Sequence, residues 1–146
     1  MIILMLPKRN DITNKMIKTT EYKKIPATIL HQITGVIDVE EVKRGINEAN
    51  EVINKVIHIY GRFNLIIDLR GISFTDLAAH KTWKIWSQSR LTEEKVNYVA
   101  IVLVDSPHTR AEMELMETET VQFFFDFNEG CNWLQNIVSI ETKNQL

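Results

Sequence analysis

The sequence predicts a single α/β domain with a mostly parallel sheet of about five strands and about four helices. Strand-like and helix-like stretches alternate in the order β-β-α-β-α-β-α-β-α, which favours helices packed on a parallel sheet. Residues 64–69 and 96–104 are nearly continuous apolar runs, typical of strands covered on both faces. With 146 residues, 45% hydrophobic and 25% charged, one core is expected. We divide the chain into an N-terminal extension (1–15), the domain (16–138) and a polar tail (139–146).

The first half of the domain predicts a hairpin followed by a long helix. Residues 25–37 are rich in β-branched side chains and read as a strand, with the more polar 16–24 as an edge strand beside it. Asp38 and Glu41 have the spacing of a capping box, and apolar residues then recur every three or four positions. We expect this helix to end at Gly61.

The middle of the domain predicts a crossover helix and a shorter second one. Residues 76–89 separate the two apolar runs and have helical spacing. Ser106 is placed to cap the next helix and Pro107 to occupy its first turn, leading into residues 109–118.

The last part of the domain is aromatic and then helical. Residues 121–125 predict a final strand, and Asn128 is a candidate cap for the last helix. The stretch FFFDF at 123–127 is more aromatic than a half-buried strand requires, so a second subunit over an edge strand is one way to cover it. Residues 141–146 are polar and are expected to fray.

Composition and charge exclude several functions. The net charge of −2 gives no field for a polyanion, so nucleic acid is not an expected partner. No apolar run is long enough to span a bilayer. Cys131 is the single cysteine, which together with the lack of a secretory pattern predicts a cytoplasmic protein with that thiol packed as a small hydrophobe.

The sequence offers no defensible catalytic or metal centre. The four histidines lack zinc-site spacing, and Ser106 with His108 does not sit in a G-x-S-x-G elbow. We therefore expect no enzyme activity, no metal and no cofactor.

Several motifs follow the pattern of one superfamily. A strand reaches Gly35 just before the capped helix, and residues 68–76, DLRGISFTD, look like the segment D-L-x-G-[VI]-x-F-x-D. Residues 99–102 look like the next strand of that pattern, and Phe124 and Phe125 with Asn132, Trp133 and Leu134 are similar to its close. Over about residues 16–138 the chain resembles the STAS-like superfamily, especially its SpoIIAA-like branch, relatives of the anti-sigma-factor antagonists.

This resemblance implies an interaction function, but it also argues against the phosphoserine switch of the antagonists. In the antagonists, serines after the aspartate that matches Asp76 are phosphorylated to break a partner interface. Here Leu77, Ala78 and Ala79 follow, and none has a hydroxyl group. The resemblance then implies a non-enzymatic interaction or regulatory module that docks a protein partner or a second copy of itself. The branch is also related in fold to CRAL-TRIO lipid-binding domains, so a small apolar or lipid-like ligand is the alternative.

Two groups of residues are the candidate sites. Ligands of open parallel sheets tend to bind beyond the carboxyl ends of the strands, where the sequence places a polar rim of Asp76, Asp105, Ser106, His108, Thr109 and Arg110. This rim is either an anion site or a capped helix start with a solvated arginine. A second group, Trp83, Trp86, Met113 and Met116, is either core or the lining of an apolar pocket or interface.

Overall fold

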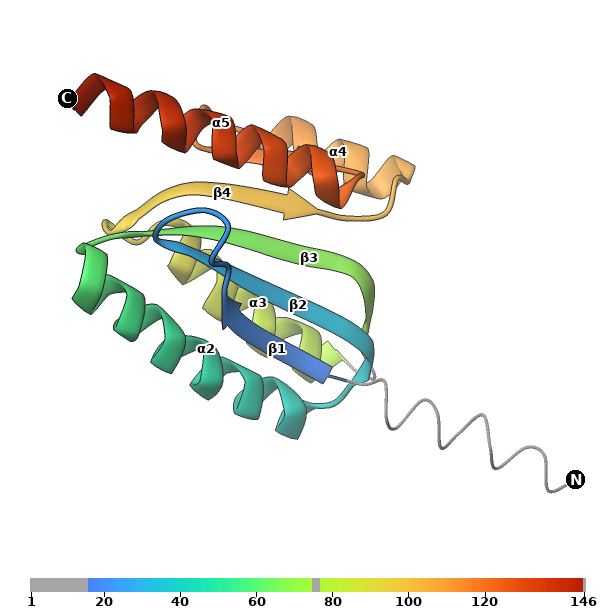
Figure 1. Cartoon of the computed structure of the whole chain (residues 1–146). Helices are drawn as coiled ribbons and strands as arrows, with labels where there is room; N and C mark the ends of the chain where they lie inside the picture. The colour runs from blue at the N-terminus through green and yellow to red at the C-terminus, as the bar shows by residue number, and fades with distance from the viewer. Residues whose placement is uncertain (1–15, 75–76, 146) are drawn as a thin grey trace, which may run out of the picture.

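The computed structural model describes residues 16–74 and 77–145, which form a five-stranded mixed sheet with four helices (Figure 1). The predicted α/β class, the order of elements and the mostly parallel sheet are confirmed. In chain order the elements are β1 (Met16–Glu21), β2 (Thr28–Ile37), α2 (Val39–Tyr60), β3 (Phe63–Phe74), α3 (Leu77–Leu91), β4 (Val96–Val102), α4 (Pro107–Met116), β5 (Val121–Phe124) and α5 (Phe127–Gln145).

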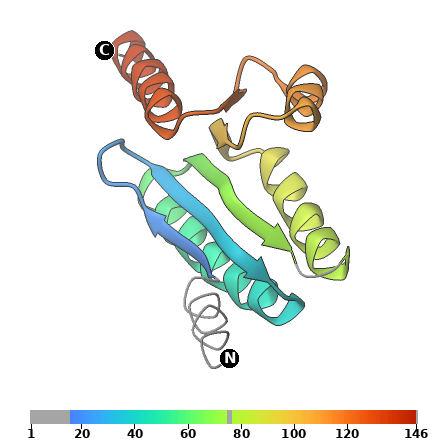
Figure 2. The same ribbon diagram turned by 90° about the vertical axis from the view of Figure 1, so that its right-hand side faces the viewer.

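The strands lie side by side in the order in which they occur in the chain. β1 pairs antiparallel with β2, as the predicted hairpin requires, and the other three pairings are parallel. Parallel crossovers are nearly always right-handed, so a sequential order places the connecting helices on one face of the sheet. Accordingly α2 and α3 lie on one side and α5 on the other (Figures 1 and 2). The side chains of α4 pack against the same core cluster as α2 and α3.

Helix α2 begins and ends where the sequence predicts. The Asp38 side chain accepts a hydrogen bond from the Glu41 amide at 2.8 Å, and Gly61 ends the helix with a φ of 80°. The Glu41 carboxylate, however, binds the backbone of Ile17 in β1 and not the helix start. Glu41 therefore contributes its backbone amide to the helix cap and its carboxylate to a tertiary contact with β1.

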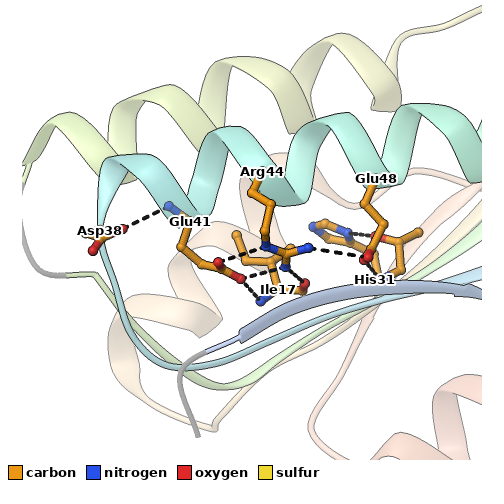
Figure 3. A network of polar contacts seen from close by, with 7 residues as sticks. Ile17, His31, Asp38, Glu41, Arg44 and Glu48 are labelled. Carbon is orange, nitrogen blue, oxygen red and sulfur yellow. Dashed lines mark hydrogen bonds and ion pairs between the residues drawn. The ribbon is translucent and has the colours of Figure 1, made fainter. Parts of the chain in front are cut away.

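Side chains of α2 occupy the outer edge of β1 (Figure 3). The Ile17 amide donates to Glu41 Oε2 at 3.0 Å, and the Ile17 carbonyl accepts from the Arg44 guanidinium. The Thr19 amide donates to Glu48 Oε1 at 2.9 Å. Backbone groups that an edge strand leaves unpaired thus have partners within the chain.

The opposite edge, β5, is occupied in the same way. The Val121 amide donates to Thr118 Oγ1 at 3.1 Å, and the Phe123 amide donates to Glu117 Oε2 at 3.0 Å. These two amides are not available to a strand from a second subunit. Homodimerisation stays a prediction. A dimer would not form by pairing a second strand with the Val121 and Phe123 amides.

The predicted strand at 64–69 is too short. β3 continues to Phe74, because its pairing with β2 resumes after a register shift between Gln32 and Thr34. β4 and β5 end slightly earlier than predicted, at Val102 and Phe124.

Two predictions about α5 are wrong. Asn128 does not cap this helix: it lies in the first turn, where its amide donates to Asp126 Oδ1 at 3.0 Å. The stretch expected to fray from residue 141 is helical as far as Gln145, and Glu141 forms an ion pair with Arg62 at 2.8 Å. Cys131 lies on α5 and is buried against the sheet, and burial raises the pKa of its thiol, as expected for a thiol packed as a small hydrophobe.

Candidate functional site

A cavity of about 470 Å³ opens between α3 and α4 on the face of the sheet that α2 also covers. This volume lies within the ~300–1,000 Å³ typical of small-molecule sites. We call it the α3–α4 pocket. Its floor is made of apolar residues of three neighbouring strands and the residue that follows β4: Ile67, Leu69, Ile101, Leu103 and Phe123.

The pocket exists because two helices cover this part of the sheet incompletely. Helix α3 buries a single narrow row, in which Ala79 and Ser87 are small and Trp83 is large. Ser87 lines the pocket at a place where a larger side chain would fill it. Helix α4 has no buried residue at all, so it does not close down on the strands beside α3.

Trp83 forms part of the pocket wall and is fixed from behind by a buried histidine. Its indole Nε1 donates to His31 Nε2 at 3.0 Å, and His31 Nδ1 lies 2.8 Å from Thr19 Oγ1. Since an indole nitrogen only donates, His31 Nε2 must accept, so the ring is neutral with its proton on Nδ1 and donates to Thr19. Burial lowers the pKa of His31 to about 4, in agreement with this assignment.

The Trp and Met group contributes to the core and, in part, to the pocket. Trp83, which is 7% exposed, and Met116 line the pocket. Trp86 packs against the His31 ring and donates to Asn50 Oδ1 at 3.0 Å. Met113 packs against the main core cluster. All four side chains belong to or pack against the main core cluster, and Trp83 and Met116 line the pocket as well.

A row of polar side chains follows the mouth of the pocket along α3. His80, Lys84 and Gln88 are spaced by four residues, are exposed and line the cavity. The His80 ring stacks on Phe74, with 5.1 Å between the ring centroids. Across the mouth stand Glu112 and Met116 of α4.

The predicted polar rim is largely committed to capping and ion pairing. Ser106 and Thr109 form a reciprocal capping box at the start of α4, although both also line the pocket. Asp105 accepts two hydrogen bonds from Arg110, at 2.7 and 2.8 Å, and this guanidinium holds the pKa of Asp105 below its usual range. The Arg110 guanidinium also lies over the Phe125 ring.

His108, another member of the rim, does not line the pocket. His108 contacts Glu112 at 2.8 Å, and Asp76 lies outside the described residues. The five rim residues that the structure describes therefore do not converge on one ligand position. A physical reason is that the strand order never reverses, and a reversal is what creates the crevice at strand ends in doubly wound sheets.

Searches for other kinds of site gave two negative findings within residues 16–74 and 77–145. No three His, Cys, Asp or Glu side chains come together as metal ligands. No helix in this part of the chain has the length and apolar character to cross a membrane. Neither a scan against models of known protein families nor a search of curated proteins gave a match to this chain.

Sequence reasoning missed most residues of the pocket. The row of His80, Lys84 and Gln88 did carry a signal, because each lies one position after a member of the buried row of α3. The strand residues of the floor look like ordinary core in the sequence. Only the gap between two helices makes them accessible.

Proposed function

We propose that this chain is a non-enzymatic binding protein and that the α3–α4 pocket takes a small apolar molecule. The observation that carries the proposal is a cavity of about 470 Å³ whose floor is entirely apolar and whose wall includes Trp83. Burial of an apolar ligand there removes its surface from water, at roughly 25 cal/mol per Å². The neutral imidazole of His31 keeps the indole of this wall in one orientation.

The roles of the reactive side chains favour binding over catalysis. The hydroxyls of Ser106 and Thr109 are engaged in the cap of α4. Both nitrogens of the His31 ring are used, by Thr19 and Trp83. A nucleophile or a general base must itself be free to reach the substrate. The side chains of Ser106, Thr109 and His31 are instead used in hydrogen bonds within the fold.

A fluorescence titration with the neutral apolar dye diphenylhexatriene tests the proposal. The wild-type protein should bind the dye with one site per chain. Met116→Trp, which adds a large ring at the pocket, should abolish binding, while Leu115→Trp should leave it unchanged. Leu115 is the matched control because it is the preceding residue of α4, is 85% exposed and does not line the pocket.

Two results would overturn this proposal. One is absence of dye binding to the wild type together with no mass co-purifying in native mass spectrometry. The other is equal binding by both tryptophan variants, because the dye would then bind elsewhere on the surface.

A second candidate function is a STAS-like interaction module without the phosphoswitch. The observation that favours it is Leu77, which begins α3 and is 79% exposed. A large exposed apolar side chain at the position where the antagonists carry their switch fits constitutive docking of a protein partner or a second copy. The α/β fold and its element order agree with this resemblance.

Affinity capture with a matched pair of variants tests the interaction module. Leu77→Asp should lose a partner that the wild type retains, and Ile85→Asp, also exposed and on the same helix, should retain it. Retention of every partner by Leu77→Asp and by an Asp76→Ala variant would count against this surface.

A further inference from the structure

We propose that the ligand of the α3–α4 pocket is an amphiphile with an anionic head group, whose acidic oxygens pair with Lys84 at the mouth. This inference rests on the proposed function, since it names the chemistry of a ligand in the same pocket. A single-chain carboxylic acid is the simplest molecule of this kind.

The charges that line the pocket leave one cation without a counterion. Arg70 is held by Asp68 at 2.9 Å, and its guanidinium lies over the ring of Phe127, a residue of α5 on the other face of the sheet. Glu112, across the mouth, lies 2.8 Å from His108, an ion pair only while that imidazole is protonated. Lys84 lines the pocket and makes no ion pair with any residue that the structure describes. An anionic ligand would supply that counterion.

The neighbours of Lys84 strengthen the preference for acceptor oxygens. His80 and Gln88 lie one turn before and one turn after it and also line the mouth. Each of these three side chains can donate a hydrogen bond, although His80 and Gln88 can also accept one, whereas an ionised carboxylate only accepts them. Stacking on Phe74 restricts the His80 ring to this side of α3. The mouth along α3 is thus a row of donors.

The row of donors and the apolar floor define the orientation of the ligand. The head group stays at the hydrated mouth, where Lys84 keeps its own contact with water. The apolar part extends over the strand residues beneath Trp83 and Met116. A ligand with a charge at one end and an apolar chain at the other can pair with Lys84 and also pack on the floor. A neutral apolar molecule can only pack on the floor.

Displacement of diphenylhexatriene by decanoate, decan-1-ol and acetate tests this assignment on the full chain. We expect decanoate to bind about tenfold more tightly than decan-1-ol, the low end for a hydrogen bond to a charged group. Lys84→Gln should remove that difference by weakening the binding of decanoate about tenfold. Lys81→Gln is the matched control, because Lys81 is exposed on the same helix but does not line the pocket.

The outcomes separate the two proposals. Equal affinities for decanoate and decan-1-ol, or a preference that survives Lys84→Gln, would overturn the head-group assignment and leave the apolar pocket in place. Failure of both decanoate and decan-1-ol to displace bound dye would also overturn the head-group assignment, whereas absence of dye binding to the wild type would overturn the proposed function itself. Displacement of the dye by acetate alone would show that a free small anion is sufficient, and this would overturn the amphiphile.

Discussion

Acid should destabilise this protein through His31. The ring is fully buried, neutral and bonded at both nitrogens, and burial lowers its pKa to about 4. In the unfolded chain a histidine titrates near ~6.5. Between these two values the unfolded state binds a proton that the folded state does not, so the free energy of unfolding falls as pH falls.

The size of this effect follows from the two pKa values. They are separated by roughly 2.5 units, and each unit corresponds to ~1.36 kcal/mol. The stability that His31 contributes is fully present above pH ~6.5, and about 3 kcal/mol of it is lost by pH ~4. That is a large share of the ~5–15 kcal/mol typical of a single domain.

Urea unfolding of wild type and His31→Gln from pH 7 to pH 4 measures this contribution. Glutamine keeps one donor and one acceptor but does not titrate, so it should lose about 3 kcal/mol less than the wild type over this range. Carboxylates with a lowered pKa, such as Glu41 and Asp68, affect both proteins equally. The exposed His58 gives the control His58→Gln, whose profile should follow the wild type.

Parallel profiles for wild type and His31→Gln would refute this reasoning. An NMR titration of the His31 ring in the wild type gives an independent check that does not depend on a variant folding. Its ring resonances should stay those of the neutral Nδ1–H tautomer at pH 5.5. Half-protonation near pH 6.5 in the folded protein would show that the contact with Trp83 does not hold the ring neutral.

Three further variants have defined expectations in urea unfolding. Gly45→Ala should cost about 1 kcal/mol in spite of the better helix propensity of alanine, because the new Cβ would lie 2.5 Å from Ile17 Cγ2; increased stability would contradict this packing. Trp83→Phe should cost about 1–3 kcal/mol, since it leaves a buried acceptor of His31 without its donor. Glu117→Ala should cost about 1 kcal/mol by removing the acceptor of the Phe123 amide, and no change would show that water replaces it fully.

The fold was predictable because local signals agreed with the global arrangement. Hydrophobic periodicity and capping residues are enough to predict the alternation of buried strands and capped helices. Asp38 and Ser106 mark two helix starts, and Gly61 marks a helix end. Errors occurred where a long-range contact overrides a local pattern. The polar tail continues α5 because Glu141 finds Arg62, a residue far away in the sequence.

The candidate site was less predictable for a geometric reason. Ser106 and Thr109 were predicted to belong to a ligand-binding rim, but they form the capping box of α4. Their spacing of three residues is the spacing of that motif. The pocket depends instead on how far α4 stands from α3, a distance that no residue pattern encodes. Trp83 and Met116 were found because large flexible or flat side chains are notable in any context, while Lys84 was not.

The occupied sheet edges bear on how this protein misfolds. The groups that satisfy β1 belong to α2, the helix that also covers its core face. A fluctuation that lifts α2 would therefore uncover apolar surface and a hydrogen-bonding edge at the same moment. Aggregation should then be governed by the population of this partly opened form.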